Sequence, residues 1–174
     1  MEIITERLIL REPRIGDFDR YWNMLTDPLA KKYTGGVTKK DYDSRLQIFK
    51  QEISQPLSES ATEFSVILRE NNLYIGYCGF RYSDELNGNE FLYGYCQDAW
   101  GHGYGYEAAL NTLKYLFSEF QADEYISTSD PANVASIKIL TKLGYKKISQ
   151  IIDEDGEIEL FRLTRKDYKD LYEI

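Results

Sequence analysis

The stretch WGHGYGYEA, residues 100–108, is the most informative part of the sequence. It follows a segment with strand-like composition and precedes apolar residues at helical spacing. Glycines at the alternate positions 101, 103 and 105 let a backbone turn sharply and bring several N–H groups close to an anion. The first amides of the following helix lack partners within the helix and add positive potential. The stretch therefore predicts a site for a phosphate or pyrophosphate group.

Two other interpretations of this stretch have to be weighed. Gly103, Gly105 and Ala108 fit the dinucleotide pattern G-x-G-x-x-A, which predicts a nicotinamide-dependent enzyme. That motif usually opens its domain, and its acidic residue closes the next strand, whereas Asp123 and Glu124 precede the next predicted strand. No Gly-Lys-Ser/Thr follows, which excludes a mononucleotide P-loop. A plain strand-to-helix turn needs fewer glycines than the three present.

The composition predicts one globular domain over residues 1–174, because 43% of the chain is hydrophobic and 15 residues are tyrosine. A net charge of −8 without a basic cluster argues against nucleic-acid binding. No apolar run approaches the roughly 18 residues of a membrane span. Cys78 and Cys96, with His102 as the single histidine, predict no metal site. We interpret both cysteines as small buried side chains of a cytoplasmic protein.

The pattern of apolar residues predicts an α+β fold in the order β-α-α-β-β-β-α-β-α-β-β, a mixed central sheet with helices on both faces. Asn71-Asn72 and Asn87-Gly88 suit tight turns with positive φ, so the three middle strands should form an antiparallel meander. Asp155-Gly156 should turn a closing hairpin. The expected strands are 6–12, 64–69, 73–82, 90–97, 125–129, 146–152 and 158–163, and the expected helices are 17–26, 40–54, one from 103, 133–143 and a last turn at 167–172.

With these residues in view, the chain resembles the GNAT superfamily of N-acetyltransferases, and more closely its branch that acetylates ribosomal-protein amino termini. TERLILR at 5–11 is similar to the branch's opening strand, and Asp27-Pro28 with Lys32-Tyr33 to its first helix–helix junction. The family's Q/R-x-x-G-x-G/A motif corresponds to residues 100–105, and residues 133–145 resemble its second cofactor motif. There are two departures: Trp100 replaces Gln or Arg, and Leu140 stands where the family often has a tyrosine acid.

The resemblance implies that acetyl-CoA is the co-substrate and that a strand splays from its neighbour to open a V-shaped cleft for it. Pantetheine would lie along Tyr95-Cys96, and Asn133 and Ser136 would face the pantetheine arm and the sulfur. The pyrophosphate would be held by the backbone of the glycine-rich turn, which comprises Gly101, His102, Gly103, Tyr104, Gly105 and Tyr106.

Attack of an amine on a thioester needs the two substrates positioned together and a route for the ammonium proton. Glu90, on the strand leading to the turn, is the candidate base, although an exposed carboxylate at a turn is the alternative. Ser136 is the candidate partner of the leaving thiolate, given Leu140, or it is simply a small residue that admits pantetheine. Tyr93 and Tyr95 are alternatives for the same role.

The acceptor amine, a protein N-terminus or a small molecule, would contact Trp22, Tyr33 and Tyr82 at the rim of the cleft. A rival hypothesis is an inactive acyl-CoA-binding module with a sensor or regulatory role, which the missing tyrosine acid favours. The sequence is compatible with a monomer or a homodimer.

Overall fold

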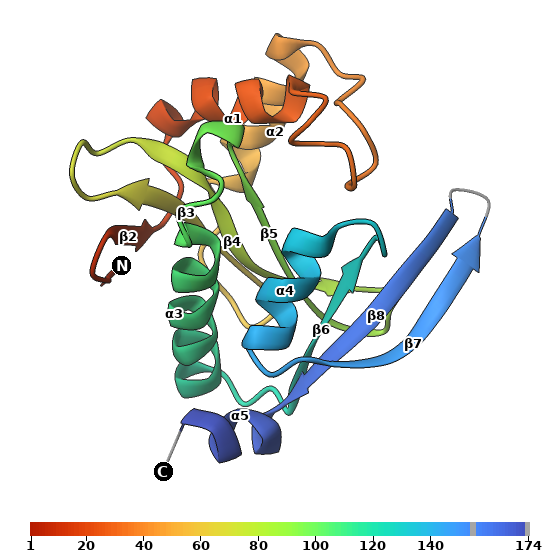
Figure 1. Ribbon diagram of the computed structural model, residues 1–174. Helices are drawn as coiled ribbons and strands as arrows, with labels where there is room; N and C mark the ends of the chain where they lie inside the picture. Colours follow the sequence, from red (N-terminus) through yellow and green to blue (C-terminus); the bar gives the residue numbers. More distant parts are fainter. Residues whose placement is uncertain (154–155, 173–174) are drawn as a thin grey trace.

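The structure, a computed structural model, describes residues 1–153 and 156–172. Within that part, eight strands form one sheet in the order β1-β2-β3-β4-β5-β6-β8-β7 (Figure 1). The strands are β1 (Glu2–Ile4), β2 (Leu8–Arg11), β3 (Ala61–Leu68), β4 (Tyr74–Ser83), β5 (Gly88–Tyr95), β6 (Glu124–Ser129), β7 (Lys146–Asp153) and β8 (Gly156–Thr164). The helices are α1 (Phe18–Thr26), α2 (Tyr42–Glu52), α3 (Tyr104–Glu119), α4 (Val134–Lys142) and α5 (Arg165–Tyr172).

The predicted meander is confirmed, because β3, β4 and β5 pair antiparallel in sequence order. Asn72 and Asn87 have φ of 60° and 48°, as their turns require. The start of the chain differs from the prediction: in place of one strand over 6–12, β1 and β2 form a hairpin. The short β1 has three residues, too few for an alternating pattern to stand out in the sequence.

Helices cover both faces of the sheet. α3 packs Ala109, Leu113 and Leu116, each 0% exposed, into the main core on one face. α1 and α2 lie together on the other face, where the Tyr21 ring meets that of Tyr77 on β4 at 6.2 Å (Figure 1). None of the helices in the described residues is long and apolar enough to cross a bilayer.

The sheet opens between β5 and β6. These two strands are parallel and pair at one position, Glu90 with Ile126, whereas β6 pairs with β8 at six positions. The V-shaped opening that the resemblance implied is therefore a feature of the fold. Beyond it, β7 and β8 form the expected closing hairpin; Asp155 of its predicted turn lies outside the described residues.

A buried ion pair fixes where α1 begins. Two parallel hydrogen bonds of 2.8 and 2.7 Å join the Arg11 guanidinium to the Asp17 carboxylate. The same carboxylate accepts from the Arg14 backbone N–H and from the Ser65 hydroxyl, each at 2.8 Å. Burial on its own would raise the pKa of Asp17, but these hydrogen bonds together lower it. Asp17 thus ties β2, β3 and the start of α1 together on one face of the sheet.

We predict that Asp17→Asn lowers the free energy of unfolding by about 3 kcal/mol at neutral pH, because it leaves a buried guanidinium without its counter-charge. Since the folded protein lowers this pKa, the stabilisation is complete above the unfolded carboxyl pKa of about 3.9 and is lost as pH falls through the folded value. The difference between variant and wild type should therefore shrink toward about pH 3.

Urea unfolding at the two pH values measures both effects, with Asp84→Asn, an exposed turn residue, as the matched control. Equal stability of wild type and Asp17→Asn at neutral pH would contradict the assignment.

Candidate active site

The glycine-rich turn is held in the conformation that an anion site requires. Gly103, with φ of 79°, is the residue immediately before α3, and this left-handed conformation suits glycine. At Gly105 a Cβ would lie 3.0 Å from Ile139 Cδ1 and 3.1 Å from a Tyr95 ring carbon, so the helix start packs closely on α4 and β5. The first N–H groups of α3 have no acceptor within the helix, which leaves them available to a ligand.

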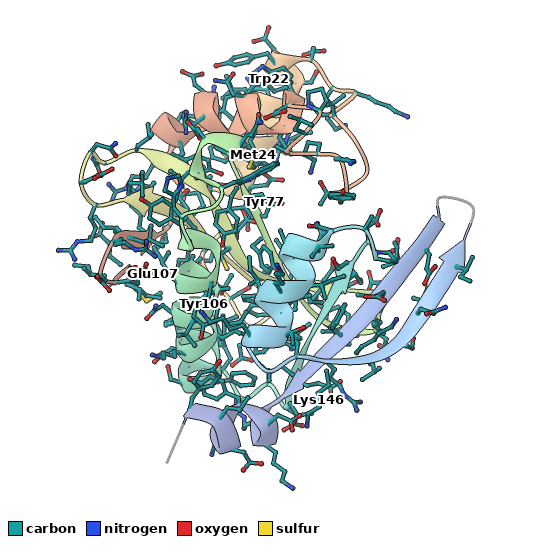
Figure 2. The ribbon with its side chains drawn as sticks, in the orientation of Figure 1. Trp22, Met24, Tyr77, Tyr106, Glu107 and Lys146 are labelled. Atoms are coloured by element: carbon teal, nitrogen blue, oxygen red, sulfur yellow. The ribbon has the colours of Figure 1, made fainter. Side chains whose placement is uncertain are left out.

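The β1–β2 turn holds the glycine-rich turn in place through Glu107 (Figure 2). The Thr5 hydroxyl donates to Glu107 Oε1 at 2.6 Å, the Arg7 N–H to the same oxygen at 2.9 Å, and Arg7 Nε to Oε2 at 2.7 Å. Arg7 Nη1 also donates to the His102 carbonyl at 2.8 Å. Burial acts to raise the pKa of Glu107, but the bonds from Thr5 and Arg7 lower it overall. Sequence reasoning missed this contact because it joins residues 100 or more positions apart.

Side chains of the β1–β2 turn and of the glycine-rich turn also pack against each other. The Arg7 guanidinium lies 4.7 Å from the centre of the Tyr104 ring, and the His102 ring stacks on Tyr104 at 5.3 Å. A pocket of about 420 Å³ adjoins the turn and is lined in part by Gly103, Tyr106 and Lys142. Lys142 Nζ lies 3.8 Å from the centre of the Tyr106 ring. The turn therefore presents amides, glycines and a neighbouring ammonium group, which fits a phosphate-bearing ligand.

Where β5 separates from β6, part of the β5 backbone has no neighbouring strand on that side. The Cys96 N–H donates to Ile75 of β4 at 2.8 Å, so by the alternation of antiparallel pairs the N–H and C=O groups of Tyr93 and Tyr95 point away from β4. The Phe91 carbonyl accepts from the Ser127 hydroxyl at 2.9 Å, and the Tyr95 carbonyl accepts from Trp100 Nε1 at 3.0 Å. Between these two contacts, the N–H of Tyr93, its carbonyl and the N–H of Tyr95 face the opening.

Two hydroxyl groups meet on the α4 side of the opening. Tyr93 Oη lies 3.0 Å from Ser136 Oγ, and burial raises the pKa of Tyr93 above its ordinary value. Asn133 caps α4: its side chain accepts from the Ser136 N–H at 3.2 Å. Leu140 is 0% exposed and belongs to the core, so the position where the family often has a tyrosine contributes only packing here.

Glu90 belongs to a different group of contacts. Its Oε2 lies 3.5 Å from Arg81 Nη2, and its Oε1 accepts from the Thr128 hydroxyl at 3.2 Å. The register pairs Glu90 with Arg81 and places both on the sheet face that α1 and α2 cover, which is the face of Tyr77. The structure thus places Glu90 and Ser136 in separate hydrogen-bonded groups, one with Arg81 and Thr128, the other with Tyr93.

The three residues expected at the acceptor rim belong to three different segments of the chain. Trp22, on α1, packs on Phe18 and on Tyr42 of α2. Tyr33 lies in the segment between α1 and α2. Tyr82, one position from Arg81, points to the opposite sheet face and donates to Asn87 across the β4–β5 turn. The pleat of β4 thus separates the Tyr82 side chain from the sheet face that α1 and α2 cover.

Both cysteines are buried, Cys78 at 0% and Cys96 at 6% exposure. Within the described ranges, no three His, Cys, Asp or Glu side chains are grouped so that they could hold a metal ion.

Comparisons with known proteins agree with this geometry. The family model described as an acetyltransferase (GNAT) domain matches residues 7–146. The curated protein p20 of Bacillus licheniformis, an uncharacterized N-acetyltransferase, is 28% identical over 176 residues, covering 95% of this chain and 97% of that protein. The crystal structure of a GNAT-family acetyltransferase from Bacillus anthracis is similar with a TM-score of 0.80 and 22% identity, covering 95% of this chain and 99% of that one.

Two further solved structures have the same fold. A candidate ribosomal-protein-serine acetyltransferase from Vibrio cholerae has a TM-score of 0.72 and 16% identity, covering 94% of this chain and 97% of that one. The aminoglycoside acetyltransferase AAC(6')-Ib, in complex with coenzyme A, has a TM-score of 0.75 and 18% identity, covering 94% and 98%. Because the family model spans most of the sequence, this chain belongs to the GNAT family of acetyltransferases.

Proposed function

We propose that this protein transfers the acetyl group of acetyl-CoA to a primary amine by direct attack in a ternary complex. The observation that carries the proposal is the open backbone edge of β5, which lies at Tyr93 and Tyr95, beyond the one pairing of β5 with β6 at Glu90. A strand edge binds an extended amide-containing chain through its N–H and C=O groups, and the pantetheine arm is such a chain. The glycine-rich turn, the candidate anion site, adjoins the end of the same edge, where the Tyr95 hydroxyl donates to the Gly105 carbonyl at 3.3 Å.

Acetyl-CoA, when bound, supplies an activated acetyl thioester. The amides of the glycine-rich turn would hold its pyrophosphate, and Lys142 is placed beside the turn for a further phosphate. We move the expected pantetheine contact from Tyr95-Cys96 to Tyr93 and Tyr95, because the Cys96 N–H is already bonded to Ile75. Asn133 would act through Ser136, whose backbone it holds at the start of α4.

The proton steps are assigned to two groups of side chains. Glu90 would accept the proton of the acceptor ammonium, with Thr128 and Arg81 orienting its carboxylate. The Tyr93–Ser136 pair would donate a hydrogen bond to the leaving sulfur from Tyr93 Oη or Ser136 Oγ and so stabilise the thiolate as it departs. Burial raises the pKa of Tyr93, so this hydroxyl acts as a hydrogen-bond donor and not as a strong acid. This pair replaces the tyrosine acid that Leu140 cannot supply.

The acceptor would approach from the side of α1 and α2, because Glu90 faces that layer. Trp22 and Tyr33 remain candidate acceptor contacts, and Tyr82 does not, since it points to the other face. The fold does not fix the acceptor, because it serves both aminoglycoside and protein-directed enzymes. A screen should include peptides, polyamines, amino acids and aminoglycosides.

We predict that Glu90→Gln lowers kcat by about 100-fold or more, because the amide accepts from Thr128 but cannot take the ammonium proton. Affinity for acetyl-CoA, measured by calorimetry, should stay the same. Glu85→Gln, an exposed residue of the same β4–β5 turn, is the matched control and should keep full activity. Wild-type activity in Glu90→Gln would show that Glu90 is not the base. If the wild type binds acetyl-CoA but acetylates no amine, the result would favour the inactive acyl-CoA-binding module.

We predict that Glu107→Gln weakens acetyl-CoA binding about tenfold, because it removes the charge that holds Arg7 against the glycine-rich turn. At saturating acetyl-CoA the kcat should be close to that of the wild type, since Glu107 touches no reacting group. Glu119→Gln, at the end of the same helix, should change neither quantity. A lowered kcat at unchanged KM for acetyl-CoA would show that Glu107 has a different role.

A further inference from the structure

A second pocket, of about 430 Å³, lies in the segment that joins α1 to α2. Four basic side chains line it, Lys31, Lys39, Lys40 and Arg45, and no acidic side chain does. The rest of the lining is apolar, hydroxyl-bearing or glycine. Its volume is in the range of pockets that hold small ligands, roughly 300–1,000 Å³. This concentration of positive charge stands in a protein of net charge −8.

The three lysines of this pocket have no carboxylate partner within residues 1–153 and 156–172. The ion pairs found there do not include Lys31, Lys39 or Lys40. Like charges brought together without counter-ions repel each other, and an anion between them would relieve that repulsion.

The most buried cation of the pocket has one donor without an acceptor. Arg45 is 9% exposed; its Nη2 donates to Tyr21 Oη and Glu52 Oε2, but its Nη1 is buried without a partner. Burial lowers the pKa of Lys31, which means that its charged form is disfavoured while no anion is present. A buried donor without an acceptor destabilises the folded protein, and a bound oxyanion would supply the acceptor.

We propose that this pocket binds an oxyanion, a phosphate or carboxylate group, held by Lys31, Lys39, Lys40 and Arg45. We assign the bound oxyanion to the acceptor molecule, whose amine would lie at Glu90. This assignment rests on the proposed function. Arg45 contacts Tyr21, and Tyr21 meets Tyr77 on the sheet face of Glu90. The pocket and the candidate base therefore belong to the same side of the protein. A free anion that binds independently of the acceptor is the other source.

Titration with inorganic phosphate tests the site without any acetyl transfer. Calorimetry at constant ionic strength, with chloride as the balancing anion, should detect phosphate binding to the wild type. The double variant Lys39→Ala/Lys40→Ala should bind phosphate at least about tenfold more weakly, because each lysine supplies a charged hydrogen bond. Lys50→Ala/Lys114→Ala removes the same charge from exposed helix positions outside the pocket and should bind like the wild type.

Lys39 and Lys40 are exposed and form no ion pair with any residue that the structure describes, so neither double variant should melt below the wild-type temperature in chloride. Phosphate binding that is absent, or equal in the two double variants, would overturn the proposal. Binding that survives Lys39→Ala/Lys40→Ala and is displaced by coenzyme A belongs to the glycine-rich turn and would overturn it too.

Kinetics with an acceptor found in the amine screen distinguish an anionic group on the acceptor from a free anion. Phosphate that competes with the acceptor, in the wild type and not in Lys39→Ala/Lys40→Ala, supports an anionic group on the acceptor. Phosphate that changes kcat without competing shows a free anion and overturns that assignment. If no amine is acetylated, the phosphate titration still stands, so failure of the proposed function and failure of the anion site remain distinguishable.

Discussion

The single pairing between β5 and β6 is the constraint on which the rest of the structure depends. Buried backbone N–H and C=O groups are almost always hydrogen-bonded, and a strand that leaves its neighbour exposes such groups. At the two ends of the open edge, side chains take over this role: Ser127 donates to the Phe91 carbonyl and Trp100 to the Tyr95 carbonyl. Between them the N–H groups of Tyr93 and Tyr95 are left for a ligand. The fold thus creates an edge whose natural complement is an extended chain with amide groups.

Two carboxylates, on opposite faces of the sheet, hold the surroundings of this edge in place. Glu107 binds the β1–β2 turn to the start of α3, which fixes the glycine-rich turn beside the end of β5. Asp17 binds β2 and β3 to the start of α1, which fixes the layer that faces Glu90. In each case one carboxylate accepts from an arginine, a hydroxyl and a backbone N–H. In the proposed reaction such contacts would position the two substrates, and positioning is a large part of the rate gain in a reaction between two bound molecules.

The features that the sequence predicted well are those with a local signal. The glycine-rich turn, the order of the main elements and the asparagine turns follow from residue spacing and conformational preference over a few residues. The contacts of Glu107 with Thr5 and Arg7 were not predicted, because no local pattern links positions so far apart. Two further features depend on strand register, which composition does not give. They are the sheet face to which Tyr82 points and the hydrogen bond of the Cys96 N–H to Ile75. The basic pocket has no strong signal in the sequence, because its four cations are spread over 15 positions and only folding brings Lys31, Lys39, Lys40 and Arg45 around one cavity.

Amide hydrogen exchange along β5 tests whether the open edge receives acetyl-CoA. Leu92 and Gly94 face β4, so their N–H groups should be protected both with and without acetyl-CoA. The N–H groups of Tyr93 and Tyr95 should exchange fast in the free protein and become protected when acetyl-CoA is added. If acetyl-CoA binds and the exchange of the Tyr93 and Tyr95 N–H groups does not change, the open edge of β5 is not the binding site of acetyl-CoA.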